Sequence, residues 1–361
     1  MNSDFELILF ILYTFGLLYV IITSGIPKTA IRETCDTAII LITVLGFSYV
    51  SINQARYTTV VDLTSYKRVY KTGISYFEPV YEFIMDTSRA MSLSFNTFIF
   101  LLLILFFTSI IKYTKKYNSD NMIVFFGIFS TVFVGNLSMN LYRQMLAASF
   151  LLFGLAYYHS TIKKYIFILL SLFSHFSAIV CLPLLFFDVT KPFKSKTLIA
   201  GISLSLIVSI ASILIGSTSI IRILIMELLQ LFDFDSIDRI ILNLKRPLES
   251  GVRYRFYYLI SIFIICMYLY IQNRRGVLKS SNIFTACNLV FIGICIYPFV
   301  YQSGQIARVV NYFFIMIPIA LYEITVNIFK SKRESLIILS VLYTLLFFSM
   351  LILRRYGSPV F

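Results

Sequence analysis

The sequence predicts an all-α, polytopic membrane protein with about 11 transmembrane helices. Apolar residues make up 59% of its 361 residues and charged residues only 13%, about half the charged share of a soluble domain. Apolar runs that approach 20 residues recur along the whole chain, and this is the length that a helix needs to cross a bilayer. Because backbone polar groups in lipid must be paired inside the protein, such runs favour helices over barrel strands.

The apolar runs divide the chain into segments of similar length. They cover residues 5–23, 36–52, 91–111, 121–137, 141–158, 165–187, 198–216, 256–271, 283–301, 306–328 and 335–353. The first run is long enough to span, and no small-residue cleavage site follows it, so we expect a helix and not a cleaved signal peptide. No internal repeat and no soluble domain is visible, and residues 1–361 are expected to form a single integral membrane domain.

The net charge of +14 could suggest a nucleic-acid ligand, but the position of the basic residues argues against one. They gather in short loops between apolar runs, at Lys112, Lys115, Lys116, Lys163, Lys164, Arg274, Arg275, Lys279, Lys330, Lys332 and Arg333. This pattern is typical of the cytoplasmic loops of a multispanning protein. The longer stretches 53–89 (five bases, four acids) and 217–255 (six bases, five acids) are nearly balanced. We place both outside, as periplasmic loops.

The run 165–187 creates a conflict of orientation. If the lysines before it and those at 191–196 are all cytoplasmic, the run must enter the membrane and return as two half-helices that turn near residues 174–177. Such a broken, re-entrant backbone is tolerated only where protein or a water-filled cavity shields it. The simpler alternative, which we favour, is that the run spans and a further crossing near residues 220–232 restores parity. Both termini then lie on the outer side.

The first stretch that interrupts the apolar runs, residues 62–81, is rich in acids, tyrosines and bases. Asp62, Tyr66 and Tyr70 are spaced by four residues, so a helix would stack them on one face. Gly73 is expected to end that helix, and Glu78, which precedes a proline, to begin the next one. Two carboxylates and a tyrosine ladder beside a membrane predict a polar site.

Two arginines lie near the outer ends of apolar runs, where a charged side chain is costly and suggests function. Arg143 and Arg308 each follow a helix start, where backbone N–H groups and a guanidinium can bind an anion such as pyrophosphate together. Alternatively, both arginines reach lipid headgroups or pair with Asp62 or Glu78.

Several further side chains have both a functional and a structural interpretation. His175 lies inside an apolar run and is either a functional group or a buried histidine bonded to a neighbouring helix. Arg253 and Arg255 could contact phosphate, although a juxtamembrane anchor is the simpler account. The loop tyrosines could stack on sugar rings or belong to an interfacial belt. The five cysteines mostly lie in or beside apolar runs without CxxC spacing, which indicates neither a zinc site nor a disulfide framework.

The order of these residues resembles the EpsG/Wzy group of bacterial polysaccharide polymerases. The matching pieces are Asp62, Tyr66 and Tyr70 at four-residue spacing, Glu78-Pro79, Arg143-Gln144, His175 with Ser177-Ala178, and Arg308 with Tyr312. Together they cover about two-thirds of the chain in the right order. The resemblance implies an O-antigen polymerase of the bacterial inner membrane, which joins undecaprenyl-pyrophosphate-linked oligosaccharide repeat units at the periplasmic face.

In that reaction an acceptor hydroxyl displaces undecaprenyl pyrophosphate. The candidates for the base are Glu78, His175 and Asp62, in that order, and those for pyrophosphate binding are Arg143, Arg308, Arg253 and Arg255. Substrate contacts are expected from Tyr66, Tyr70, Gln144 and Tyr312. Pyrophosphate is already a good leaving group, so no metal and no cofactor is expected. The expected partners are the lipid-linked oligosaccharide, the bilayer and a chain-length regulator protein.

Two alternatives remain open at this point. A transporter or flippase for lipid-linked sugars would favour internal repeats and ionisable residues spread through the spans. An O-antigen ligase would use the same chemistry with a different acceptor.

Overall fold

The computed structural model describes residues 3–23, 26, 29–54, 61–74, 77–115, 121–131, 141–215, 251–275, 281–300, 306–329 and 331–356. These residues are almost entirely helical, and no strand occurs among them. Four helical stretches are long and apolar enough to cross a membrane by length and composition, at residues 95–114, 255–274, 282–300 and 308–328. The chain is therefore a helical membrane protein, while the full number of crossings stays a prediction.

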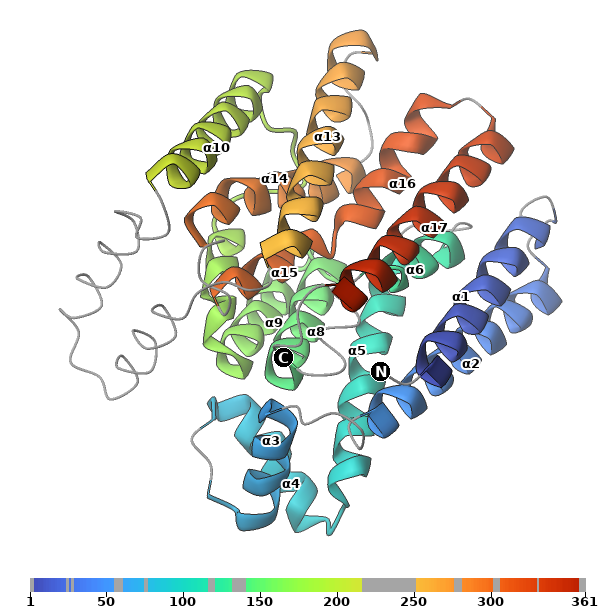
Figure 1. The fold of residues 1–361 in the computed structure, drawn as a ribbon, viewed down its shortest axis with the longest axis vertical. Helices are drawn as coiled ribbons and strands as arrows, with labels where there is room; N and C mark the ends of the chain where they lie inside the picture. Colours follow the sequence, from blue (N-terminus) through green and yellow to red (C-terminus); the bar gives the residue numbers. More distant parts are fainter. Residues whose placement is uncertain are drawn as a thin grey trace. The chain divides into compact units, whose positions relative to one another are not determined.

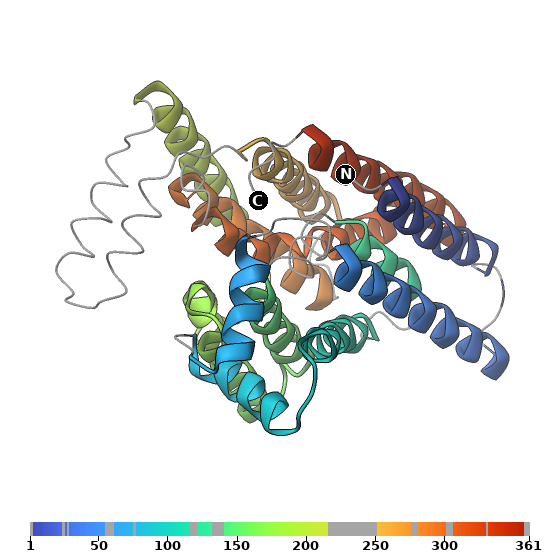
Figure 2. The ribbon, with the colours of Figure 1, turned by 60° about the horizontal axis from the view of Figure 1, so that its bottom comes forward.

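The chain forms two compact units, of which the first comprises residues 1–188 and 329–351 together with the C-terminal residue. It contains α1 (Ser3–Thr23), α2 (Ala30–Gln54), α3 (Val61–Thr72), α4 (Pro79–Ala90), α5 (Phe95–Thr114), α6 (Asn121–Phe129), α8 (Tyr142–Ala156), α9 (Thr161–Ser174), the 3₁₀ segment η2 (Phe176–Leu185) and most of α17 (Lys332–Tyr356). The helices α1 and α2 lie side by side (Figures 1 and 2), and α8 packs between α5 and α9. Small residues allow α8 and α9 to pack closely: Ser171 donates across to the Ala147 carbonyl at 2.7 Å, and a Cβ at Gly154 would lie 3.3 Å from the Ile168 side chain.

The segment 165–187 folds back on itself. The helix α9 ends at Ser174, His175 is extended (φ −162°, ψ 121°), and η2 runs back beside α9. Near the open end of this hairpin, Tyr165 donates to the Leu185 carbonyl at 3.4 Å, and Tyr158 donates to the Phe187 carbonyl at 2.7 Å. The simple span that we favoured for this run is therefore wrong in its geometry. The broken hairpin is what the chain forms, and its two ends lie together.

The second unit comprises residues 189–328 and 352–360. Its helices are α10 (Ser195–Ile215), α13 (Gly251–Arg275), α14 (Ser281–Val300), η3 (Ile306–Val310), α15 (Asn311–Phe314) and α16 (Ile317–Ile328). The expected single helix over 306–328 is divided into three pieces. One physical reason is Pro318, which lacks a backbone N–H and so interrupts the ladder of hydrogen bonds at the start of α16. α14 packs against α10, α13 and α16 and forms the core of this unit.

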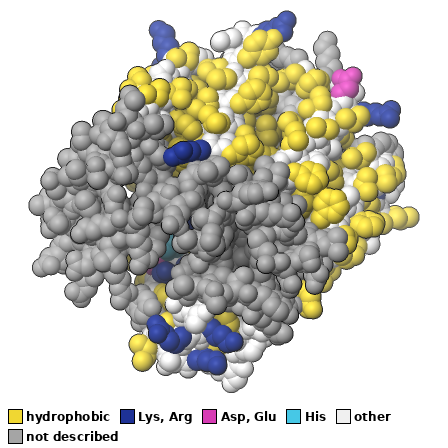
Figure 3. Space-filling model, viewed as in Figure 1, with side chains coloured by type: hydrophobic (Ala, Val, Ile, Leu, Met, Phe, Trp, Pro, Cys, Tyr) yellow, Lys and Arg dark blue, Asp and Glu magenta, His cyan; other side chains and the backbone are white. Residues whose placement is uncertain are grey.

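The two stretches that were placed outside differ in what the structure describes. Residues 53–89 are not an irregular loop, since they contain α3 and α4. Most of 217–255 lies outside the described residues. In Figure 3, Lys and Arg side chains gather over α3 and α4, whereas hydrophobic side chains cover much of the other described surface in that view. The expectation of a single domain over 1–361 stays a prediction.

Candidate functional site

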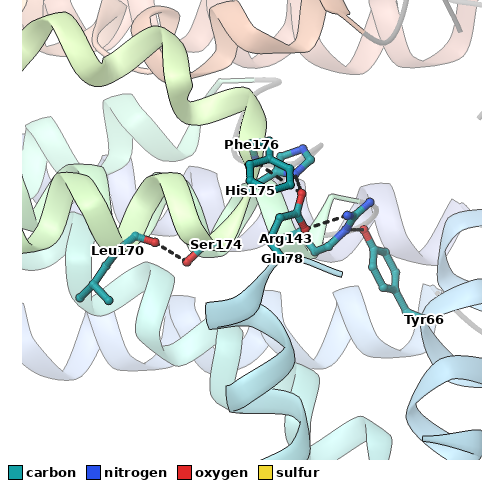
Figure 4. A network of polar contacts seen from close by, with 7 residues as sticks. All are labelled: Tyr66, Glu78, Arg143, Leu170, Ser174, His175 and Phe176. Carbon is teal, nitrogen blue, oxygen red and sulfur yellow. Dashed lines mark hydrogen bonds and ion pairs between the residues drawn. The ribbon is translucent and has the colours of Figure 1, made fainter. Parts of the chain in front are cut away.

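The turn between α3 and α4 places Glu78 at the site. The predicted helix boundaries are confirmed here, because α3 ends at Thr72 and Gly73 takes φ +75°, a left-handed conformation that suits glycine. Glu78 then occupies the N-cap of α4, and Pro79 is the first helical residue. The Glu78 side chain is only 5% exposed and points away from its own helix start toward α8 and α9 (Figure 4).

Arg143 reaches Glu78 from the first turn of α8. Its Nη1 donates to Oε2 of Glu78 at 2.8 Å, and its Nε donates to the Tyr66 hydroxyl at 3.2 Å. The guanidinium also lies over the Phe77 ring, 4.7 Å from its centre, and 5.8 Å from the centre of the Tyr66 ring. Arginine is suited to such a place because its planar group can stack on rings and donate in two directions at once. The pairing with Glu78, which the sequence left as an alternative, is therefore present.

His175 reaches the same carboxylate from the break in the hairpin. Its Nδ1 lies 2.7 Å from Oε1 of Glu78, and the backbone N–H of Phe176 donates to the same oxygen at 3.3 Å. The extended conformation of His175 frees the backbone N–H of Phe176 from the α9 ladder, so that it can donate to Glu78. In a continuous helix this N–H would donate to the carbonyl four residues before it.

The negative charge of Glu78 determines which ring nitrogen of His175 carries the hydrogen. Burial alone raises the pKa of Glu78, but the hydrogen bond from His175 and the positive charge of Arg143 outweigh it and lower the pKa to about 2. Glu78 is thus a carboxylate at neutral pH and can only accept. Nδ1 of His175 must carry the hydrogen, so in the neutral imidazole the lone pair is on Nε2. Among the described residues, Nε2 has no hydrogen-bond partner.

Aromatic side chains pack around the ion pair of Arg143 and Glu78. Tyr66 contacts Phe77, Tyr81 and Tyr142, with ring centres 5.4 to 5.9 Å apart. Tyr81 and Tyr142 are almost fully buried. The side chains of Arg143 and His175 are 27% and 26% exposed, whereas Glu78 is covered. The guanidinium of Arg143 and the imidazole of His175 are therefore partly accessible, while the Glu78 carboxylate that they share is buried.

The site lies far from the basic end of the first unit. We define the basic end as Lys112, Lys163 and Lys164, which lie beside Tyr157 and Tyr158 just after α8. Arg143 stands at the opposite end of that helix. Its 15 residues correspond to roughly 20 Å at 1.5 Å per residue. The hairpin tip at His175 is separated from the basic end by the 14 residues of α9, again roughly 20 Å.

The remaining candidate residues are not all brought to this cluster. Tyr70 is on the same buried face of α3 as Tyr66, but its hydroxyl donates to the Leu93 carbonyl at 2.8 Å and secures α3 to the start of α5. Gln144 follows Arg143 and is buried. Asp62 is the second residue of α3, and its side chain lies outside the described part of the chain.

Four further candidates belong to the second unit. Arg308 is partly exposed in η3, Tyr312 is 1% exposed in α15, and Arg255 is exposed near the start of α13. The Arg253 side chain lies outside the described residues. From the sequence we also expect Arg143 and Arg308 to converge on one cavity, and this stays a prediction.

Sequence reasoning missed two members of the site. Phe77 forms the ring surface under Arg143, and Phe176 supplies its backbone N–H to Glu78. Phe77 adjoins the Glu78-Pro79 pair, which was a usable signal, but a backbone donor leaves no trace in the residue type. In the described residues, no group of three His, Cys, Asp or Glu side chains is placed to hold a metal ion.

The comparison with known families assigns the chain to one family. A model of the EpsG family matches residues 39–358, which includes every residue of the site. No curated protein and no solved structure matches the chain. The match covers nearly the whole chain, and the family is one of polysaccharide polymerase-like membrane proteins. The chain therefore belongs to the EpsG family.

Proposed function

We propose that this protein is a polysaccharide polymerase of the bacterial inner membrane, an O-antigen polymerase in its chemistry. It would join undecaprenyl-pyrophosphate-linked oligosaccharide repeat units without a metal or a cofactor. The observation that carries the proposal is the contact of His175 and Arg143 with one buried carboxylate, Glu78, in a member of the EpsG family. A base and a cation held at fixed distances are what a sugar transfer to a hydroxyl needs.

The base of this reaction is His175 in our proposal, with Glu78 as the residue that positions it. The sequence ranked Glu78 first, but a carboxyl group with a pKa of about 2 is a weak proton acceptor. Glu78 instead holds Nδ1–H and directs Nε2 away from itself (Figure 4). Asp62 remains a third candidate. A group that accepts a proton in the transition state contributes about 10²- to 10⁴-fold in rate.

The reaction balances in one displacement step. The acceptor hydroxyl oxygen forms a bond to the anomeric carbon of the donor, and its proton moves to Nε2 of His175. The bond between that carbon and the pyrophosphate oxygen breaks, and undecaprenyl pyrophosphate leaves with the electron pair. The trio of Glu78, Arg143 and neutral His175 has no net charge, so proton uptake makes it +1 as negative charge develops on the leaving group.

Arg143 is the cation that we assign to the pyrophosphate in the first unit. It stands in the first turn of α8, where backbone N–H groups and the helix dipole also favour an anion. In the second unit, we assign pyrophosphate binding to Arg308, Arg253 and Arg255. Tyr66, Tyr70, Gln144 and Tyr312 stay proposed substrate contacts, and a chain-length regulator stays a proposed partner.

The position of the site supports the periplasmic face as the place of reaction. The positive-inside rule assigns the basic end to the cytoplasm. The site is roughly 20 Å from that end along α8, which is about two-thirds of the 30 Å thickness of the hydrocarbon core. The exposed parts of His175 and Arg143 would then open toward the periplasmic half.

The test is reconstitution with synthetic lipid-linked repeat units and separation of the products by length. A polymerase converts them into a ladder and releases undecaprenyl pyrophosphate. Transport of the intact units across the bilayer without a ladder would instead indicate a flippase. Transfer of one unit only, and only when lipid A core is added, would indicate a ligase.

A further inference from the structure

We propose that the basic end of the first unit is a binding site for an anionic phospholipid of the cytoplasmic leaflet, and that this lipid secures the open end of the hairpin. The site consists of Lys112 from α5, Lys163 and Lys164 from α9, and the tyrosines Tyr157 and Tyr158 between α8 and α9. It lies at the opposite end of α8 from the candidate active site, and the inference does not depend on the proposed reaction.

Three ammonium groups converge on the two tyrosines. Nζ of Lys112 lies 5.2 Å and Nζ of Lys163 lies 4.9 Å from the centre of the Tyr157 ring. Because both nitrogens lie about 5 Å from one ring centre, they are at most about 10 Å apart. Nζ of Lys164 lies 4.6 Å from the centre of the neighbouring ring of Tyr158. One phosphate-bearing headgroup can therefore approach Lys112 and Lys163 together, and Lys164 adds a third cation from the next residue of α9.

No carboxylate lies on the three helices that supply this site. The sequence has no Asp or Glu from 91 to 119 or from 153 to 187, and Asp188 is the first acid after the hairpin. In the described part of the chain, none of the three lysines takes part in an ion pair. Each ammonium group lies over a tyrosine ring, and an anionic headgroup supplies these cations with a counter-charge.

The surroundings favour a lipid over a soluble anion. On α9, exposed apolar side chains continue from the lysines along one stripe, at Ile162, Ile166, Leu169 and Phe173, with exposed fractions from 40% to 74%. Acyl chains can lie along this stripe while the headgroup contacts the lysines. Tyrosine at the membrane interface and clustered cytoplasmic lysines are both typical of contact with anionic headgroups.

The same tyrosines connect the site to the hairpin. Tyr157 stacks on Phe167 of α9 (ring centres 5.7 Å apart), and the Tyr158 hydroxyl donates to the Phe187 carbonyl at the returning end of the hairpin. A lipid that holds Lys163 and Lys164 near these rings therefore stabilises the junction of α8, α9 and η2.

The experiment compares two triple variants with equal loss of charge. The full chain is purified and titrated with phosphatidylglycerol or with phosphatidylcholine, and bound lipid is counted by native mass spectrometry. The test variant carries Lys112→Gln, Lys163→Gln and Lys164→Gln. The control carries Lys67→Gln, Arg68→Gln and Lys71→Gln, which removes three exposed cations of α3.

We expect the test variant to bind phosphatidylglycerol about a hundredfold more weakly, since each lysine near an anionic surface contributes about fivefold. The control and phosphatidylcholine binding should not change. If the triple variant does not fold, the three single variants replace it, each with an expected loss of about fivefold. Equal losses in test and control, or binding of inorganic phosphate as tight as that of the lipid, would overturn the proposal.

Discussion

The pairing of Arg143 with Glu78 can be tested by a double-mutant cycle on stability. Removing the cation with Arg143→Met leaves a carboxylate that is 5% exposed with only His175 and one N–H as partners. Breaking one side of a buried ion pair costs about 3–5 kcal/mol. We expect the lower end, about 3 kcal/mol, because the arginine side chain is 27% exposed and is partly compensated by water.

The cycle isolates the pair from the other contacts of each residue. Glu78→Gln removes the charge but keeps the shape, and it leaves Arg143 with one hydroxyl and two rings. In the double variant no unpaired charge remains, so its loss should be smaller than the two single losses together by about 2 kcal/mol.

Unfolding of the purified protein in one detergent, followed by heat or by denaturant, measures all four members of the cycle. A loss of 3 kcal/mol corresponds to a fall in Tm of about 6–12 °C for a unit of this size. Losses that simply add would show that Arg143 and Glu78 do not act on each other, and would refute the electrostatic account of the site.

Three further predictions follow from the same contacts. First, the lowered pKa of Glu78 means that its contribution, about 3 kcal/mol, is complete above pH 4.5 and is lost only as the pH falls toward 2; a loss of the Glu78-dependent stability at pH 5–6, measured against Glu78→Gln, would contradict this. Second, Tyr66→Phe removes the acceptor of the Arg143 Nε–H but keeps the ring, so we expect about 1 kcal/mol lower stability and a modest loss of polymer, whereas a wild-type product ladder would mean that the hydroxyl has no role. Third, Gly73→Ala forces an alanine into the left-handed conformation, with its Cβ 2.7 Å from Arg89 Nη1. We expect a loss of about 1–2 kcal/mol in stability, and an unchanged Tm would contradict this.

The sequence predicted the site better than the path of the chain. Spacing and capping rules placed α3, Gly73 and the Glu78-Pro79 start correctly, because these are local effects of backbone chemistry. For residues 165–187 the sequence left two alternatives, a simple span and a hairpin that turns at His175. We favoured the span, which is wrong, because the run is apolar on both sides of the break. The contact with the Glu78 carboxylate at the start of α4 favours the hairpin. Such a tertiary contact leaves no pattern in the local sequence.

The partners of Arg143 illustrate the same limit. The sequence showed a cation at a helix start, and it offered both pyrophosphate and Glu78 as counter-charges. Only the fold shows that residues 65 positions apart meet at 2.8 Å. Once this pair is known, the low pKa of Glu78 follows, and with it the transfer of the base role to His175.

The rate of polymer formation by His175→Gln and by Glu78→Gln tests this assignment most directly. Both variants are assayed with the same synthetic lipid-linked repeat units, next to a measurement of donor binding. If His175 is the base and Glu78 its positioning partner, His175→Gln should lose about two to four orders of magnitude in rate with donor binding preserved. The amide oxygen of Glu78→Gln can still accept the Nδ1–H bond, so this variant should lose less rate than His175→Gln. A normal ladder from His175→Gln beside an inactive Glu78→Gln would contradict the account and return the base to Glu78.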